Sequence, residues 1–398
     1  MAARRPFVCF VIERLADRSG GAERIVVELA NRLAASGRRV HLITYERGMD
    51  EPFYALARGV THMNLRVPTS QRSHVRRVLD RVRDGLHAKG PHPKLMQKLL
   101  WHSKRGGFVR ALERYLALHR PDVVVAVAPP TMVALANIRP QHAFRRVASL
   151  HNVPALDLES LVRWDRNPLD IEQRKQALQS FDAITVLQTA FRSWFDEPLR
   201  SKVHVIPNPV YSASSTPVEA RERVVLYVGR LATPKRVDIL IDAWAKLKDR
   251  FGDWRVEVFG TGILEPALQR KIRALGLEQV VQLRGHTRDI AAEYARAAIL
   301  AHPAEYEGWG LSVSEALARG VPCVGFADCP GINALIVHEH NGLLVPPADN
   351  RVDNFASALA RLMADDELRT RLGAAGPGSV AQFAPDAVQA MWEHVLDG

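Results

Sequence analysis

Short apolar runs, each followed by a loop and then by a segment with helical spacing, recur along the whole chain. Runs of this kind are typical of the buried strands of parallel sheets. Because the same strand, loop and helix unit repeats in both halves, we predict an α/β protein with two doubly wound parallel sheets facing across a cleft. The predicted strands are residues 7–12, 40–44, 122–127, 146–150, 182–187, 203–206, 224–228, 255–259, 280–283, 298–301 and 321–326.

One break in this pattern divides the chain. Pro207-Asn208-Pro209 interrupts the alternation, and residues 211–220 are rich in Ser, Pro and Thr, as linkers are. A chain of 398 residues is also too long for one ordinary hydrophobic core. The predicted parts are an N-terminal domain at residues 1–208, a linker at 209–222, a C-terminal domain at 223–380 and a terminal helical segment at 381–398.

A glycine-broken loop and a short helix precede the strand predicted at 321–326. Gly308 and Gly310 flank Trp309, and good helix formers begin at Leu311. The start of a helix leaves backbone N–H groups unpaired and carries partial positive charge, which suits a phosphate or diphosphate. The loop is therefore a candidate site for a sugar nucleotide.

Two carboxylates frame this loop. Glu307 precedes the helix and Glu315 lies within it. Beside a phosphate, a carboxylate needs another task, and accepting hydrogen bonds from sugar hydroxyls is an obvious one. An alternative stays open: Ser312-x-x-Glu315 matches a capping box that only satisfies backbone donors, and Glu307 is then a solvated loop charge.

Further polar residues follow other predicted strands. Arg230 and Lys235 come after the strand at 224–228, where a guanidinium can fork onto phosphate oxygens and an ammonium adds a point charge. His151 follows the strand at 146–150, at the sheet edge where ligands bind in open α/β folds, although a lone histidine is more often structural. Gly20-Gly21 precedes a helix and either admits a phosphate or acceptor or only makes a tight turn.

Together these motifs resemble the retaining GT-B glycosyltransferases of the large family four. The resemblance rests on Glu-Gly-aromatic-Gly-Leu with a second Glu-Ala at 307–316, on Gly-Arg and Lys at 229–235, and on Gly-Gly-Ala-Glu at 20–23. It implies two Rossmann-like domains, with Glu307 on the donor sugar, Glu315 on the nucleotide ribose, and Arg230 and Lys235 on the diphosphate.

The resemblance also implies roles for other positions. His151 stands where the family has a functional histidine, Gly20 and Gly21 line the cleft beside the donor phosphates, and Arg284 opens a segment that holds the base. The terminal helical segment is expected to cross back onto the N-terminal domain. Two positions depart from the family: Trp309 replaces the usual phenylalanine, and Ala334 stands where a carboxylate is common.

Charge is concentrated in the first half of the chain. The net charge is +11, and residues 66–120 hold 14 Lys and Arg against three Asp and Glu. Basic amphipathic helices of this kind contact anionic membrane surfaces, although most pack on a core with solvated basic sides. Nucleic acid is not an expected partner, because the cations lack the interleaved aromatic residues of a stacking platform.

Composition restricts the remaining choices. The chain has only three cysteines, as is usual for proteins of a reducing cytosol. No apolar run approaches the roughly 20 residues that span a bilayer. We therefore expect a cytoplasmic protein, peripheral on the cytoplasmic face of the inner membrane. No Asp-x-Asp follows an apolar strand, so neither a metal nor another cofactor is expected. The sequence makes no prediction about oligomeric state.

The predicted function is retaining transfer of a hexose or N-acetylhexosamine from a nucleotide-sugar to an acceptor. UDP is the most frequent carrier in the family, and the start of the chain looks like that of enzymes extending lipid-linked, including polyprenyl-diphosphate-linked, or cell-surface glycans. Two alternatives stay open. One is a sugar-nucleotide 2-epimerase on the same fold, and the other is a basic nucleic-acid or membrane-binding protein without catalysis.

Overall fold

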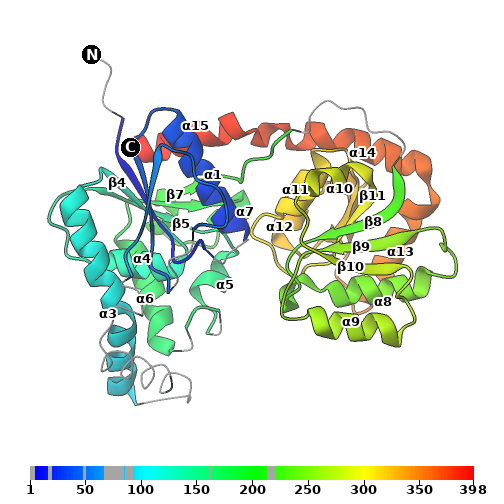
Figure 1. Cartoon of the computed structure of the whole chain (residues 1–398), viewed down its shortest axis with the longest axis horizontal. Helices are drawn as coiled ribbons and strands as arrows, with labels where there is room; N and C mark the ends of the chain where they lie inside the picture. The colour runs from blue at the N-terminus through cyan, green and yellow to red at the C-terminus, as the bar shows by residue number, and fades with distance from the viewer. Residues whose placement is uncertain are drawn as a thin grey trace. The chain divides into compact units, whose positions relative to one another are not determined.

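The chain forms two compact units, each built around one parallel sheet (Figure 1). The computed structural model describes residues 5–16, 20–47, 51–66, 85, 93–161, 163–165, 167–212 and 221–398. The first unit comprises Met1–Pro207 together with Val388–Gly398, and the second comprises Asn208–Ala387. Two doubly wound parallel sheets were predicted, and the structure confirms them.

In the first unit, seven parallel strands run in the order β3-β2-β1-β4-β5-β6-β7. The strand β3 was not predicted, because only alternate side chains of its five residues approach burial. The strands are β1 (Val8–Val11), β2 (Val40–Thr44), β3 (Val60–Asn64), β4 (Val123–Val127), β5 (Arg145–Ser149), β6 (Ala183–Val186) and β7 (Val203–Val205).

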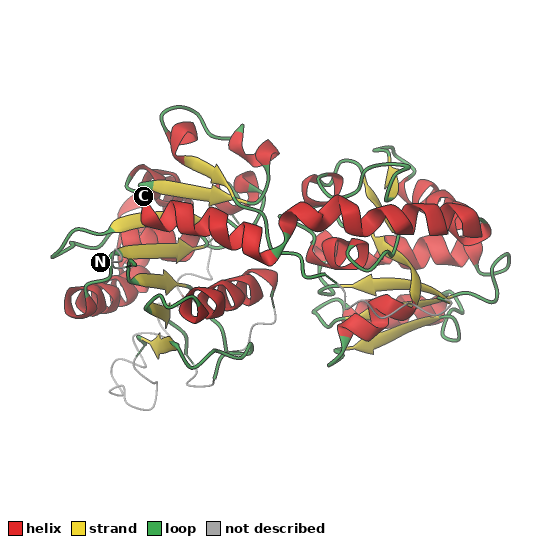
Figure 2. Cartoon of the chain, turned by 90° about the horizontal axis from the view of Figure 1, so that it is seen from above, coloured by secondary structure: helices red, strands yellow, loops and turns green. Residues whose placement is uncertain are grey.

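Helices lie on both faces of this sheet (Figure 2). Those of the first unit are α1 (Gly21–Ala35), α3 (Lys94–His119), α4 (Pro129–Ala136), α5 (Pro154–Leu158), α6 (Pro168–Gln179), α7 (Thr189–Arg192) and the 3₁₀ turn η2 (Leu199–Lys202). The apolar segments at 95–101 and 108–118 form one continuous helix, α3. Most of the basic stretch before it, residues 67–84 and 86–92, lies outside the described residues.

The C-terminal helix α15 (Pro385–Asp397) completes the core of the first unit. Its apolar face, which includes Trp392, packs with residues of β1, β2 and β4 in one buried cluster. At its end, Asp397 accepts two hydrogen bonds from the guanidinium of Arg38, at 2.7 and 2.8 Å. Because Arg38 is almost fully buried, this paired contact fixes the end of the helix against the unit.

In the second unit, six parallel strands run in the order β10-β9-β8-β11-β12-β13. They are β8 (Glu222–Val228), β9 (Arg255–Phe259), β10 (Val281–Gly285), β11 (Ala297–His302), β12 (Cys323–Phe326) and β13 (Gly342–Val345). The helices are η3 (Thr233–Lys235), α8 (Val237–Leu247), α9 (Glu265–Ala274), α10 (Ile290–Arg296), α11 (Leu311–Leu317), α12 (Pro330–Asn333), α13 (Arg351–Ala364), α14 (Asp366–Val380) and η4 (Ala381–Phe383).

Helices α11 and α14 approach each other closely because α14 carries glycines at the contact. A Cβ on Gly373 would lie 2.4 Å from the carbonyl oxygen of Gly320, and one on Gly376 would lie 2.6 Å from that of Leu317. No side chain fits in these spaces. Helix α14 continues to Val380 although Pro377 lies inside it.

The strand order locates the place where each unit can bind a ligand. Connections leave β1 and β4 toward opposite sides of the first sheet, and the same reversal separates β8 from β11 in the second. In open α/β sheets, ligands bind outside the carboxyl ends of the two strands at such a switch point. The residues that follow β1, β8 and β11 are therefore the ones to consider first.

Candidate active site

Three of the predicted site residues follow the neighbouring strands β8 and β11 at the switch point of the second sheet, and two of them, Lys235 and Glu307, are in contact. Arg230 follows β8, Lys235 ends the η3 turn, and Glu307 lies in the loop after β11. The strands β8 and β11 are direct neighbours, with Leu226 opposite Leu300. The pairing of these two strands thus brings together residues that lie more than 70 positions apart in the sequence.

The carboxylate of Glu307 is the centre of this cluster. Its Oε1 forms an ion pair with Nζ of Lys235 and also lies 2.9 Å from Nε2 of His302. Burial alone would raise the pKa of this carboxyl group, but the charge of Lys235 and the hydrogen bond from His302 outweigh it and hold the pKa well below its usual range. Glu307 is therefore an ionised hydrogen-bond acceptor.

The second oxygen of Glu307, Oε2, differs from the first. Every contact that the carboxylate makes within the described residues goes to Oε1. The side chain is 16% exposed, so Oε2 can be reached from solvent. A carboxylate with one oxygen held and one open can accept a hydroxyl hydrogen from a sugar.

Arg230 presents its guanidinium to solvent at the end of β8. Its backbone carbonyl accepts a hydrogen bond from the hydroxyl of Tyr227 at 3.2 Å, and within the described part of the chain no carboxylate pairs with its side chain. The neighbouring Arg236 is different, because Asp238 and Glu305 both bind it. Of these two arginines, Arg230 is the one available to an anionic ligand.

Glu315 lies on α11, and its Oε2 accepts a hydrogen bond of 2.9 Å from the hydroxyl of Tyr294. The capping-box alternative is wrong. The residue that caps α11 is Gly310, without any side-chain cap, and Ser312 instead places its hydroxyl 3.2 Å from Nδ1 of His302. Glu315 therefore takes no part in a capping box at the start of α11.

The loop before α11 is shaped by glycines. Gly310 has φ of 85°, a left-handed conformation that favours glycine, and it leads directly into Leu311 at the helix start. Gly308 is buried before it. Trp309 is only 4% exposed, and its ring packs edge-on against Phe383 with centroids 4.8 Å apart. The indole therefore anchors the loop by packing, and its buried Nε1 has no hydrogen-bond partner among the described residues.

Arg284 lies apart from the carboxylate cluster, on the edge strand β10. Its side chain is exposed and donates a hydrogen bond of 3.2 Å to Gln282. The next residue, Gly285, has φ of 66°, and its carbonyl accepts the N–H of Gly260 at 2.7 Å. The loops after β9 and β10 are thereby joined through their backbones.

In the first unit, His151 follows β5 and is nearly buried. Thr185 donates a hydrogen bond to Oγ of Ser149 at 3.0 Å, and that Oγ lies 3.1 Å from Nε2 of His151. The Ser149 proton is therefore directed at Nε2, which leaves the ring proton on Nδ1. This Nδ1 is buried without a hydrogen-bond partner among the described residues. Burial lowers the pKa of His151 to about 4, so the ring is neutral near pH 7.

Gly20 and Gly21 mark the start of α1, after the β1 strand. Gly20 occupies the N-cap position without a side-chain cap, and residues 17–19 before it lie outside the described residues. The earlier part of this loop is held by Glu46, whose buried carboxylate accepts the N–H groups of Leu15 and Ala16 at 3.2 and 3.1 Å. Sequence patterns did not single out Glu46, because a buried loop carboxylate looks like any surface charge.

Comparison with known proteins assigns both units. A family model described as Glycosyltransferase Family 4 matches residues 19–213, and one described as Glycosyl transferases group 1 matches residues 213–378. This chain is a GT-B glycosyltransferase of family four. Membership of family four, which the motifs indicated, is thereby confirmed, and the chain belongs to the glycosyltransferase class of enzymes.

Two relatives match nearly the whole of this glycosyltransferase at low identity, and this chain spans only about two fifths of the length of the first one. An exopolysaccharide phosphotransferase of Streptomyces coelicolor is 25% identical over 96% of this chain and 39% of its own length. An uncharacterized glycosyltransferase of Haemophilus influenzae is 23% identical over 95% of this chain and 96% of its own. The crystal structure of a TarM variant of S. aureus, in complex with Fondaparinux, alpha-GlcNAc-glycerol and UDP, has a TM-score of 0.76 at 13% identity, over 99% of this chain and 100% of that one.

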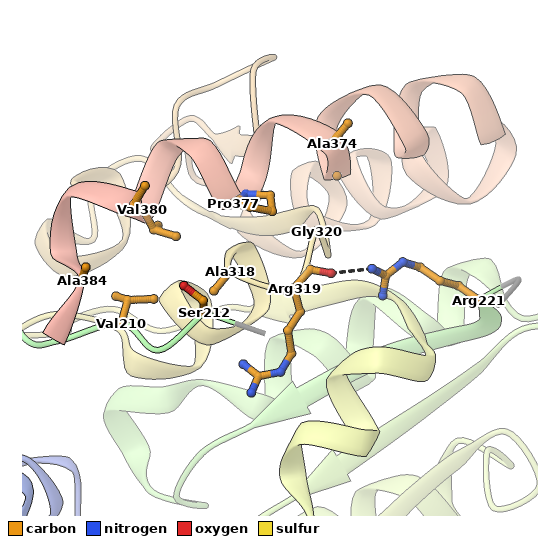
Figure 3. Close-up of a pocket in the computed structure, with 12 residues that line it drawn as sticks. Val210, Ser212, Arg221, Ala318, Arg319, Gly320, Ala374, Pro377, Val380 and Ala384 are labelled. Carbon is orange, nitrogen blue, oxygen red and sulfur yellow. Dashed lines mark hydrogen bonds between the residues drawn. The ribbon is translucent and has the colours of Figure 1, made fainter. Parts of the chain in front are cut away.

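The glycosyltransferase also has a pocket of about 470 Å³ in the second unit (Figure 3). It lies at the end of α11 opposite to the glycine loop and is lined mainly by small and apolar residues of α14 and its surroundings. The guanidinium of Arg221 in its wall already donates to four backbone carbonyls, of Tyr294, Ala295, Ala297 and Arg319. None of the predicted site residues lines this pocket, so it is separate from the candidate active site.

Within the described residues, no group of three His, Cys, Asp or Glu side chains is arranged to hold a metal ion. Among the helices of the same residues, none combines the length and the apolar composition that crossing a bilayer needs.

Proposed function

We propose that this glycosyltransferase moves a hexose or N-acetylhexosamine from a UDP-sugar to a lipid-linked or cell-surface glycan, with retention of the anomeric configuration. The observation that carries the proposal is the ion pair of Lys235 with Glu307 at the switch point of the second sheet, next to the exposed Arg230 at the end of β8. The structure of TarM with UDP and a GlcNAc derivative supports the choice of donor.

The two cations would act on the diphosphate. As the bond between the anomeric carbon and the diphosphate breaks, negative charge grows on the leaving oxygen. The open guanidinium of Arg230 can bind phosphate oxygens in a forked arrangement, and the ammonium of Lys235 adds a second positive charge. The helix α11 has only seven residues, so its dipole adds less than these side chains.

The polar acceptors and donors around them would orient the sugar and the nucleoside. Oε2 of Glu307 accepts a sugar hydroxyl, and Glu315, already held by Tyr294, accepts hydroxyls of the ribose. Backbone groups beside Arg284 hold the base. In the first unit, the Nδ1–H of His151 is a donor for a sugar or phosphate oxygen, and the backbone at Gly20 and Gly21, where α1 begins, offers further N–H donors.

A donor screen tests this proposal. Purified enzyme is incubated with UDP-, GDP- and ADP-sugars, with and without a glycan acceptor, and products are identified by mass. Replacing Arg230 or Lys235 by Ala should lower donor turnover by roughly 100-fold, whereas Arg250→Ala, which removes an exposed cation of the same unit, should leave it unchanged.

Two results would contradict the assignment. Turnover of Arg230→Ala and Lys235→Ala within a few-fold of wild type would exclude the diphosphate role. An epimerised nucleotide-sugar formed without any acceptor would identify a 2-epimerase instead. Because the cations neutralise the diphosphate in this proposal, EDTA should leave turnover unchanged, and a loss restored by Mg²⁺ would show that a metal is required.

We also propose that the enzyme contacts the anionic face of a membrane through residues 66–120. In the described part of this segment, the first turns of α3 expose Leu95, Met96 and Leu99 beside Lys98. Apolar side chains next to cations suit the boundary between lipid headgroups and acyl chains. Co-sedimentation with vesicles rich in anionic lipid should fall for Leu95→Ser with Leu99→Ser, and equal binding by the double variant would rule out this surface.

A further inference from the structure

We propose that His302 and Ser312 are positioning residues that hold Oε1 of Glu307, so that only Oε2 is presented to the donor sugar. This inference rests on the proposed function and assigns positioning roles to two residues that the sequence analysis did not connect with Glu307. It concerns how the sugar-binding carboxylate is oriented, in addition to what it binds.

The geometry begins with the two contacts on one oxygen. Lys235 and His302 both reach Oε1, while Oε2 has no partner within the described residues. In the proposed reaction Lys235 also serves the diphosphate, so its contact with Glu307 weakens when the donor binds. His302 then remains as the contact that keeps the carboxylate from rotating.

The imidazole of His302 is itself fixed on three sides. A carboxylate oxygen can only accept, so Nε2 carries the proton and donates it to Glu307. The other nitrogen, Nδ1, is then an acceptor for the hydroxyl of Ser312 at 3.2 Å. The ring of Tyr227 stacks on the imidazole with centroids 6.0 Å apart and an interplanar angle of 12°. His302 is 1% exposed, so water does not compete for these bonds.

The backbone supports the same arrangement. His302 is the last residue of β11 and Ser312 lies in the first turn of α11, so a strand end and a helix start define the ring position. On the other side of the carboxylate, Gly331 packs so closely that a Cβ there would lie 2.5 Å from Cβ of Glu307. A carboxylate held in this way meets the sugar without first losing rotational freedom, which favours the rate of the chemical step over binding of the nucleotide.

A pair of polar substitutions tests the proposal. In His302→Gln the side-chain amide can reach the position of Nε2 and donate to Glu307, whereas in His302→Asn the shorter amide stays near Nδ1 and keeps only the Ser312 contact. Both variants bury a similar amide, so stability differs little between them. His340→Asn, at an exposed histidine of the same unit, is the matched control.

The expected result separates orientation from folding and from nucleotide binding. His302→Asn should lower kcat for the best donor at least roughly 10-fold, His302→Gln should recover most of that loss, and Ser312→Ala should fall between wild type and His302→Asn. The affinity for UDP alone, measured by calorimetry, should stay within about threefold of wild type in all of the variants. That limit is below the 1.4 kcal/mol to which a tenfold change in affinity corresponds.

Other outcomes overturn the inference in distinguishable ways. If wild type turns over a donor and His302→Asn equals His302→Gln in kcat, the positioning role is wrong while the proposed function stands. If the loss appears equally in UDP affinity, His302 supports the fold of the site and does not orient Glu307. If wild type turns over no nucleotide-sugar, the proposed function itself fails, and the role of His302 fails with it.

Discussion

The role of a polar side chain at the end of a buried strand depends on which groups its atoms contact. His151 and His302 both end or follow such strands, and both are nearly buried. The ring nitrogens of His302 are both occupied, which makes it a support for Glu307. In His151, Nε2 lies beside Ser149, whereas the buried Nδ1 has no hydrogen-bond partner among the described residues.

Burial of His151 makes stability depend on pH. Its pKa is about 4 in the folded chain against an ordinary value near 6.5, so the unfolded chain binds a proton between these values that the folded chain does not. The free energy of unfolding should therefore fall as pH falls through this window, and His151 alone should account for about 2 kcal/mol between pH 7 and pH 4.5. Urea unfolding at both pH values should show a correspondingly smaller loss for His151→Asn. An equal loss in the variant would contradict this account.

At the residue scale, the charged residues of the candidate site could be predicted from the sequence, but the residues that hold them in place could not. Glu307, Lys235 and Arg230 could be predicted because charged residues at strand ends stand out against apolar runs. The supporting roles of His302 and Ser312 at Glu307, and of Tyr294 at Glu315, could not, because no sequence pattern marks these side-chain contacts. His302 did carry a usable signal, since it is a polar residue that ends a buried strand just as His151 follows one.

Among the elements, helix α14 shows how a missing side chain sets a packing distance. Gly376 lies against the carbonyl of Leu317, whereas Gly378 of the same helix has no heavy atom within 4 Å of its hypothetical Cβ. Gly376→Ala should therefore destabilise the second unit by about 1–3 kcal/mol through overpacking. Gly378→Ala should be neutral or stabilising by up to about 1 kcal/mol, because alanine favours the helix.

Hydrogen exchange of β11 and β12 amides measures both effects. Lower protection in Gly376→Ala with unchanged or higher protection in Gly378→Ala is expected. Equal protection in the two variants would show that α14 can move away from α11 without cost.

Elements with strong periodicity could be predicted, and those without it could not. The runs that became β4, β8 and β11 are continuous apolar segments and were placed within two residues. The strand β3 is half-buried, and α4, which was not predicted, begins with Pro129-Pro130, a pair that suits the first turn of a helix. In α14, Pro377 did not end the helix as proline usually does.

For the whole molecule, α15 makes the first unit depend on residues distant in sequence. Trp392 is 5% exposed and lies in the core cluster with β1, β2 and β4, while Met391 beside it is 40% exposed. Trp392→Ala should lower the opening free energy of β1 and β4 amides by about 3–5 kcal/mol and leave β8 and β11 amides unchanged. Met391→Ala is the control and should alter neither. An equal loss in both sheets would mean that the two units do not unfold separately.

The same helix has a consequence for biosynthesis. A ribosome that has translated residues 1–387 has supplied every residue of the second unit. The first unit still lacks residues 388–398, the part of α15 that covers Arg38 and the apolar surface around β1. Domains usually mature from the N-terminus as they are made. Here the order is inverted, because the part made first is completed last, and until then its uncovered apolar surface is what a chaperone would recognise in the nascent chain.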